Sequence, residues 1–237
     1  MGSVRVIELQ LVAFIMVFSI TGLVPILDMI FPAMASFYLL ILSRYAFPSR
    51  NSSAAASRQE IFDGSTLFKL YVVVGTTVGL FLPLAYVLGG FARGDDYAVR
   101  SATPHLFLLA FQILTENIVS GLSLFSQPVR AMVPLLYTVR RIFVILDWLH
   151  DVWISKTLPA NAQQRDVSWF WFGRSLAVAN MVYFSVNLLC FLIPLFLPRA
   201  FESYFKERDD DDELVLKKAE ERQASSSLSL DSDKKAD

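Results

Sequence analysis

Long uncharged runs of apolar residues dominate the chain. Residues 9–27, LQLVAFIMVFSITGLVPIL, form 19 positions without a charged side chain. That is about the length that an α-helix needs to cross the ~30 Å hydrocarbon core of a bilayer. The pattern predicts an all-α integral membrane bundle of about six helical segments, at residues 9–27, 29–46, 67–88, 106–125, 129–151 and 169–197.

The segment 129–151 differs from the others, because it contains two adjacent arginines. On a helical wheel at about 100° per residue, it has two distinct faces. The polar face holds Arg130, Tyr137, Thr138, Arg140, Arg141, Asp147, Trp148 and Asp151, and Ala131, Met132, Leu135, Leu136, Val139, Ile142, Phe143, Leu146 and Leu149 form the apolar one. Such a helix either lies in the membrane interface with its basic face toward the headgroups, or spans the membrane with its polar face toward another helix or a water-filled cavity. The first placement leaves five spans, the second six.

A comparison of depths favours the spanning placement. If Pro128 marks the turn before the segment, Glu116 lies 12 residues before it and Arg140 lies 12 residues after it. An antiparallel pair of helices would then bring the acid and the base to the same depth, where a lone Glu is costly. The alternative is a Glu116 that stays protonated and bonds to Asn117 or to a neighbouring helix. We predict an intramembrane polar cluster of Glu116, Asn117, Arg140, Arg141 and Asp147.

The distribution of basic residues also favours six spans. The chain has 21 Lys and Arg residues. With six spans and a cytosolic N-terminus, 14 of them lie in the cytosol, three lie within spans (Arg140, Arg141 and Arg174) and four lie outside (Arg93, Arg100, Lys156 and Arg165). Five spans divide them 10 against 10. Because basic residues concentrate on the cytosolic side, we expect both termini to be cytosolic.

The connections between the segments are short. Asp28, flanked by prolines, predicts a tight hairpin turn between 9–27 and 29–46. The polar residues 92–104 predict a loop, and Pro104 suits the start of the helix that follows it.

Small residues in the segment 67–88 suggest close packing of helices. Gly75 and Gly79 form a small-xxx-small pattern, which lets a second helix approach closely. The plainer interpretation is that glycine is common in membrane helices. The single cysteine, Cys190, lies in an apolar run and is expected to be a buried small side chain.

The last part of the chain, residues 198–237, is a charged tail. Its composition predicts a largely disordered cytosolic segment with a short helix around 213–223. Lys234 and Lys235 resemble the dilysine signal by which coat proteins return membrane proteins to the endoplasmic reticulum. Asn51 begins the one glycosylation sequon, which six spans place in the cytosol.

Candidate chemistry is sparse. A net charge of −1 gives no basic field for nucleic acid. Asp147, His150 and Asp151 faintly suggest metal-binding acids, but a polar cluster at the water end of a helix explains them better. The chain has no G-x-S-x-G, H-E-x-x-H, Gly-rich phosphate loop or cysteine pair. We expect no enzyme activity, no metal and no cofactor.

Three stretches carry a resemblance to a known family. FPAMASFYLLILSRYAFPS, VGLFLPLAYVLGGFARGDDYAVRSATPHLFLL and ILTENIVSGLSLFSQPVRAMVPLLYTVRRIFVILDW look like a plant family of uncharacterised multi-pass membrane proteins, a domain of unknown function. The resemblance covers about residues 5–197. It implies a plant origin and a membrane location, and it supplies no catalytic or binding residues.

Two functions therefore remain open. The leading hypothesis is a non-enzymatic membrane protein of the endoplasmic reticulum or a connected membrane, which acts through helix-helix association, including association with its own copies, or through partners of its tail. The rival is a small transporter or channel with a polar path lined by Glu116, Arg140 and Arg141.

Overall fold

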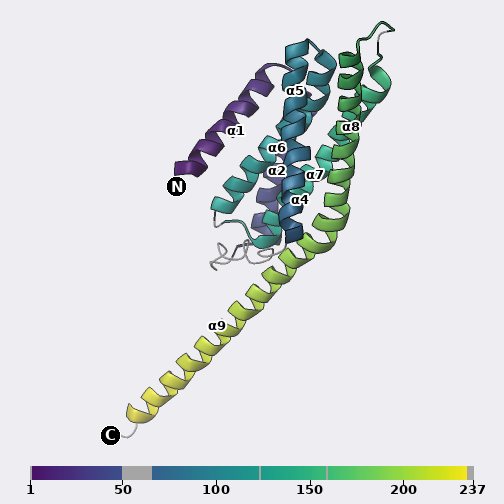
Figure 1. Ribbon diagram of the computed structural model, residues 1–237. Helices are drawn as coiled ribbons and strands as arrows, with labels where there is room; N and C mark the ends of the chain where they lie inside the picture. Colours follow the sequence, from purple (N-terminus) through teal and green to yellow (C-terminus); the bar gives the residue numbers. More distant parts are fainter. Residues whose placement is uncertain (1, 50–65, 123, 159, 234–237) are drawn as a thin grey trace.

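The chain folds into a bundle of long helices (Figure 1). The computed structural model describes residues 2–49, 66–122, 124–158 and 160–233, and over these ranges it contains no strand, only an isolated bridge between Pro48 and Phe125. The all-α prediction is confirmed. In chain order the helices are α1 (Gly2–Ile20), α2 (Ile26–Ile41), α4 (Thr66–Thr76), α5 (Leu82–Arg93), α6 (Asp96–Gly121), α7 (Gln127–His150), α8 (Gln164–Val186) and α9 (Leu197–Asp233).

Four π-helical stretches extend or join these helices. They are η1 (Leu42–Ala46) after α2, η2 (Thr77–Phe81) between α4 and α5, η3 (Asp151–Ser155) after α7, and η4 (Asn187–Phe196) between α8 and α9. A π-turn holds one more residue than an α-turn and commonly marks a functional or strained position. Because η2 and η4 each have a helix directly before and after them, α4–η2–α5 and α8–η4–α9 form two continuous helical rods.

From α4 onward, successive elements run in opposite directions between the two ends of the bundle: the rod α4–η2–α5, then α6, then α7, then α8 (Figure 1). At one end the Ser126 hydroxyl donates to the carbonyl of Phe47 over 2.9 Å, and the Tyr204 hydroxyl donates to that of Pro48 over 3.4 Å. At the other end Lys156 and Trp169 both donate to Asp95. We call these the Pro48 end and the Asp95 end.

The first turn lies earlier than the sequence pattern suggested. Helix α1 ends at Ile20, and Gly22 takes a left-handed φ of 67° that favours glycine. Pro25 then precedes the first residue of α2, where its fixed φ suits a helix start. The prediction of a turn at Asp28 is wrong, because Asp28 lies in the first turn of α2 and is buried.

Helix α6 likewise begins earlier than expected. The Asp95 carboxylate accepts from the backbone N–H of Ala98 over 3.2 Å, and this N-cap starts the helix at Asp96. The prediction of a loop over 92–104 is wrong for most of its length, and Pro104 sits inside the helix. Side-chain caps and burial of this segment outweigh its polar composition: Thr103 and Ser101, for example, return their hydroxyls to carbonyls one turn back.

Within the described residues, three helical stretches are long and apolar enough to cross a membrane, namely Ile26–Ala46, Leu70–Arg93 and Gln164–Asp210. They overlap the predicted segments 29–46, 67–88 and 169–197. That 9–27, 106–125 and 129–151 also cross stays a prediction.

The charged tail continues the last of these stretches. Helix α9 follows α8–η4 and projects from the bundle at the Pro48 end (Figure 1). Residues 198–233, expected to be largely disordered, are helical, and Glu213 and Lys217 form an ion pair of 2.7 Å one turn apart. The domain division at residue 197 stays a prediction.

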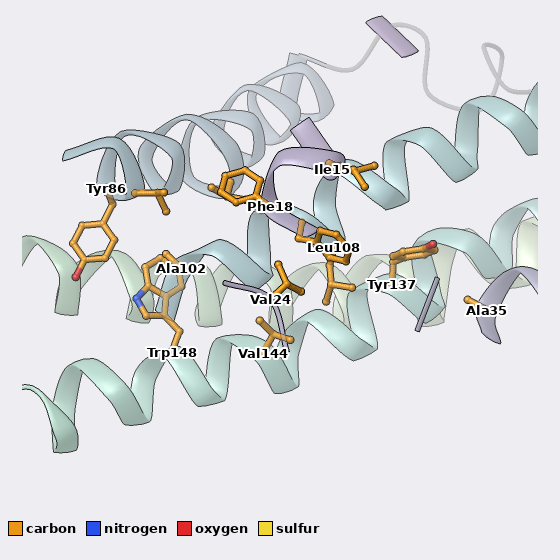
Figure 2. Packing of buried hydrophobic residues seen from close by; sticks show 14 of the residues in the cluster. Ile15, Phe18, Val24, Ala35, Tyr86, Ala102, Leu108, Tyr137, Val144 and Trp148 are labelled. Carbon is orange, nitrogen blue, oxygen red and sulfur yellow. The ribbon is translucent and has the colours of Figure 1, made fainter. Parts of the chain in front are cut away.

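Aromatic side chains fill the core near the Asp95 end. Tyr86 of α5 stacks on Trp148 of α7 at 5.9 Å and on Trp169 of α8 at 5.0 Å between ring centroids. Figure 2 shows Tyr86 and Trp148 beside Ala102 of α6. Because Tyr86 and Trp148 are fully buried, this stack fixes the spacing of α5, α7 and α8.

Candidate functional site

The polar face of α7 points into the bundle. Tyr137, Thr138, Arg141 and Trp148 are buried, whereas Val139, Phe143 and Leu146 of the apolar face are exposed. For these side chains the burial is the reverse of that in a helix of a water-soluble protein, while Ala131 of the apolar face is buried and Asp147 of the polar face is exposed. Val133 and Val144 of the same helix are buried beside these polar side chains.

Arg140 pairs with an acid that the sequence pattern did not single out as a partner. Its Nη2 and Nε atoms lie 2.7 and 2.8 Å from the same carboxylate oxygen of Asp28 in α2. The Asp28 side chain is 4% exposed and that of Arg140 is 21% exposed. The sequence predicts Glu116 at the depth of Arg140 and places Asp28 in a turn, so Asp28 is not expected as the partner of Arg140.

Arg141 points toward α6 and α8. Its Nη2 donates to the Gln112 side-chain oxygen, and the Gln112 amide donates to Glu116 over 2.9 Å. The guanidinium carbon also lies 4.6 Å from the centre of the Phe184 ring. Gln112 therefore connects the arginine with the acid, and the polar cluster of α6 and α7 extends over three residues.

The other two members of the predicted cluster lie at its edge. Asn117 is half-buried on α6, and Asp147 is exposed near the end of α7. Beyond it, Nδ1 of His150 lies 3.9 Å from a carboxylate oxygen of Asp151; His150 is exposed and Asp151 is half-buried. Among the described residues no three histidine, cysteine or acidic side chains form a metal-binding group.

His105 is a buried polar residue that the sequence pattern did not suggest. Its Nε2 lies 2.8 Å from the carbonyl oxygen of Gly79 in η2, and its ring packs 5.4 Å from Phe184. Its Nδ1, together with Arg141 Nε, Thr138 Oγ1, Trp148 Nε1 and Asn180 Oδ1, lacks a hydrogen-bond partner within the described part of the chain. The interior between α6, α7 and α8 thus keeps unused hydrogen-bonding capacity, which is costly in a buried site.

The predicted packing glycines lie against α8. A Cβ added at Gly75 would meet the Tyr183 hydroxyl at 1.9 Å, and one at Gly79 would meet Phe184 at 3.0 Å. Gly173, which the pattern of small residues did not reveal, is as close: its Cβ would meet the Tyr86 ring at 2.7 Å. Both partners therefore contribute glycines to this contact, Gly75 and Gly79 from α4–η2 and Gly173 from α8, and these glycines let α8 lie close to α4–η2–α5.

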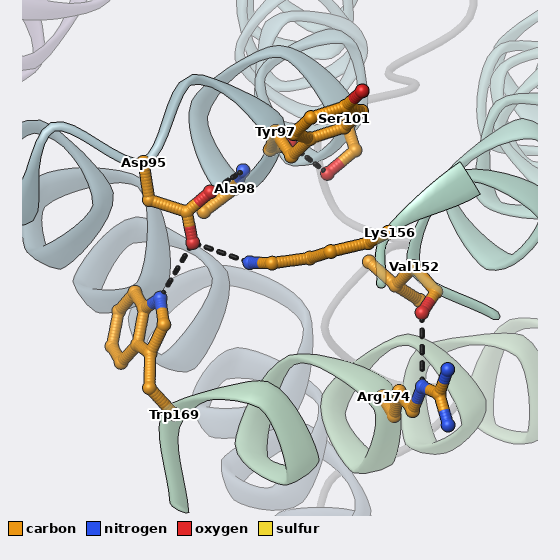
Figure 3. A network of polar contacts seen from close by, with 8 residues as sticks. All are labelled: Asp95, Tyr97, Ala98, Ser101, Val152, Lys156, Trp169 and Arg174. Carbon is orange, nitrogen blue, oxygen red and sulfur yellow. Dashed lines mark hydrogen bonds and ion pairs between the residues drawn. The ribbon is translucent and has the colours of Figure 1, made fainter. Parts of the chain in front are cut away.

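A polar network closes the Asp95 end (Figure 3). Asp95 caps α6 and accepts from Lys156 and, over 2.8 Å, from the Trp169 indole. Burial raises the pKa of the Asp95 carboxyl, but the hydrogen bonds from Lys156, Trp169 and Ala98 outweigh that effect, so this pKa lies below its ordinary value. The network joins the α5–α6 turn to the α7–α8 connection.

Arginine and aromatic rings form a second contact at this end. Arg174 donates from Nε to the carbonyl of Val152 over 2.9 Å (Figure 3). Its guanidinium lies 4.0 Å from the Phe170 ring centre and 4.6 Å from that of Trp153. Amphipathic aromatic residues of this kind gather where a membrane meets water.

Two sequence features are not placed by the structure, and a third is placed differently from the prediction. Asn51 of the sequon and the pair Lys234 and Lys235 lie outside the described residues. Cys190, expected to be buried, is exposed on the apolar stretch η4, where its neighbours Leu189 and Ile193 are also exposed. The prediction of burial is wrong, since η4 turns this face away from the other helices.

Comparisons with known proteins identify the family but no better-known relative. Neither the curated proteins nor the solved structures gave a match. A family model described as a domain of unknown function, DUF7733, matches residues 2–205, which include α1 to α8 and the start of α9. The chain therefore belongs to the DUF7733 family of uncharacterised proteins.

Proposed function

We propose that the chain is a multi-pass integral membrane protein with no catalytic activity, which holds a rigid helical bundle in the bilayer and offers its tail to cytosolic partners. The observation that carries this proposal is the orientation of α7 around Arg141. The polar side chains Tyr137, Thr138, Arg141 and Trp148 are buried, whereas the apolar side chains Val139, Phe143 and Leu146 are exposed. A helix with that orientation suits lipid outside and protein inside. The same orientation argues against the interfacial placement, in which the basic face would meet headgroups.

The outer surfaces of the neighbouring helices support the same placement. Large apolar side chains are exposed on α4–η2–α5, on α7 and on α8–η4; they include Val73, Phe81, Leu88, Phe143, Leu146, Val182 and Leu189. Soluble monomers rarely expose so many large apolar side chains along several helices. The stretch Leu70–Arg93 has 24 residues, which at 1.5 Å per residue is about 36 Å and exceeds the thickness of a hydrocarbon core.

The scaffold role rests on how the charged groups are used. Arg140 is paired with Asp28, and Arg141 is linked through Gln112 to Glu116. The Arg140–Asp28 contact joins α7 to α2 and the Arg141–Gln112 contact joins α7 to α6, so the polar face of α7 acts as a set of crosslinks. Six crossings, cytosolic termini, residence in the endoplasmic reticulum through coat-protein recognition of Lys234 and Lys235, and association with other copies are parts of the same proposal.

A test of topology uses the single cysteine. With Cys190 changed to Ser, one new cysteine is placed at Asn161 in the α7–α8 connection or at Glu207 in α9. A membrane-impermeant maleimide applied to sealed microsomes should label Asn161→Cys only after the membrane is permeabilised, and should label Glu207→Cys at once. Equal labelling of both, or release of the protein by alkaline carbonate, would contradict the membrane proposal.

A second candidate is the transporter with a path along Glu116, Arg140 and Arg141. The observation in its favour is the group of buried atoms without partners on His105, Arg141 and Asn180, which would suit a passing polar solute. In liposomes, a transporter would lose flux on Arg141→Leu while its abundance is unchanged. Under the scaffold proposal, the purified protein carries no ion or metabolite flux, and any effect of Arg141→Leu follows protein abundance.

A further inference from the structure

A hollow at the Asp95 end combines positive charge with an apolar floor. It has a volume of about 700 Å³ and lies between the last turn of α5 and the first turns of α8. Arg93 and Arg165 line it together with Gln163 and Ser168, and Trp169 and Phe172 form its apolar part. Two guanidinium groups, an amide and a hydroxyl are the donors that bind phosphate oxygens best.

Two acidic side chains near the hollow are already engaged. Asp95 is bonded to Lys156 and Trp169, and Asp166 accepts from the backbone N–H of Gln163 over 3.2 Å in the capping box of α8. Within the described part of the chain, neither Arg93 nor Arg165 forms an ion pair. The arginines therefore keep their charge available to a ligand.

The floor of the hollow is held rigidly. The Trp169 indole is fixed by its bond to Asp95 (Figure 3) and stacks on Tyr86 at 5.0 Å. Arg93 lies over the same indole, 4.7 Å from a ring centre. This arrangement positions the Arg93 guanidinium beside an apolar surface before a ligand arrives, which lowers the entropy cost of binding.

The position of the hollow indicates the kind of ligand. It lies where the apolar stretch Leu70–Arg93 ends and the apolar stretch Gln164–Asp210 begins. In the proposed bilayer this is the level of the lipid headgroups. A ligand there meets cations on the water side and Trp169 and Phe172 on the lipid side.

We propose that this hollow binds the phosphate group of an anionic phospholipid, with Arg93 and Arg165 on the phosphate oxygens and the start of an acyl chain against Trp169 and Phe172. The proposal rests on the membrane location argued above. It adds a specific lipid site on the side of the membrane opposite to the tail.

The test uses the full chain in detergent micelles and native mass spectrometry. Dioctanoyl phosphatidylglycerol is titrated, and the fraction of lipid-bound protein gives an apparent Kd. We expect one saturable site, and a Kd about tenfold higher in the double variant Arg93→Gln/Arg165→Gln. The matched control is Arg100→Gln, which removes an exposed arginine at the same end but outside the hollow and should leave the Kd within about twofold.

Further arms separate the other outcomes. Arg165→Gln alone changes only an exposed side chain, so it keeps the test informative if the double variant folds poorly, and it should raise the Kd by about threefold.

Equal affinity for dioctanoyl phosphatidylcholine, or an unchanged Kd in both variants, would overturn the proposal. If inorganic phosphate binds the hollow in the absence of lipid and displaces the lipid, the hollow is a site for free phosphate and not for a phospholipid. Failure of carbonate resistance rejects the membrane proposal, whereas a membrane-embedded protein without lipid selectivity rejects only this site.

Discussion

Arg140 of α7 contacts Asp28 of α2, 112 positions away in the chain, through two nitrogen atoms. Its Nη2 and Nε lie 2.7 and 2.8 Å from the same carboxylate oxygen of Asp28. Asp28 is almost fully enclosed, while Arg140 keeps a path to the outside. The pair fastens the N-terminal hairpin α1–α2 to the rest of the bundle, in which α7 is central.

The first prediction concerns this pair. Arg140→Leu leaves the Asp28 carboxylate buried without its partner, and breaking a buried pair from one side costs about 3–5 kcal/mol. The double variant Asp28→Leu/Arg140→Leu removes both charges and should recover much of that loss. Unfolding in detergent, followed by circular dichroism, gives the three free energies. Arg44→Leu, an exposed arginine of η1, is the control. A double variant that is no more stable than Arg140→Leu would show that the two residues do not act together.

The second prediction concerns the contact of α8 with α5. Gly173→Ala places a Cβ at 2.7 Å from the ring of Tyr86, which cannot move because it is stacked on Trp148 and Trp169. We expect a loss of about 1–3 kcal/mol in the free energy of unfolding, as for other overpacked cores. Gly121→Ala meets nothing within 4 Å and should be neutral or slightly stabilising. Equal effects of the two changes would contradict the close approach of the helices.

The third prediction concerns pH. Because the pKa of Asp95 is lower in the folded protein than its ordinary value of 3.8, its contribution to stability is complete above that value and is lost as the pH falls through the folded pKa. Asp95→Asn keeps a good N-cap but loses the charge that binds Lys156, so we expect a loss of about 1–3 kcal/mol at pH 7. The difference between the two proteins should shrink below about pH 4. A difference that stays constant down to pH 2 would rule out the titration of Asp95 as its cause. Asp96→Asn, one residue away and exposed, is the control.

The fourth prediction concerns Arg174. Arg174→Lys keeps the charge but loses the planar group that lies on Phe170 and Trp153, so it should lose nearly as much stability as Arg174→Gln, about 1–2 kcal/mol. Thermal unfolding of both variants in detergent measures this. Full stability of Arg174→Lys would show that the charge alone matters.

The sequence predicts the helices better than their partners. Apolar runs and the two-faced pattern of 129–151 depend only on local spacing, so both were available from the chain itself. The partner of Arg140 depends on the relative depth of α2 and α7, and a shift of the first turn from Asp28 to Gly22 was enough to hide it. Gln112 carries no charge, so matching acids with bases could not find its role beside Arg141.

Helix starts and glycine contacts show the same limit. Residues 92–104 are polar in composition, yet the Asp95 cap and burial in the bundle make most of them helical. Gly75 and Gly79 are four residues apart and form a recognisable pattern. Gly173 is equally close to its neighbour but stands alone among bulky aromatic residues, so only the folded protein identifies it.

The continuity of α8, η4 and α9 has a practical consequence for imaging. A chain of 26.7 kDa is small for electron microscopy of single particles, and flexible tags give no help with alignment. Because α9 extends a helix that is anchored in the bundle, a compact helical protein fused in frame after Lys218 would inherit a fixed orientation. The natural tail thus doubles as an attachment point for a fiducial marker, and the bundle itself would need no alteration.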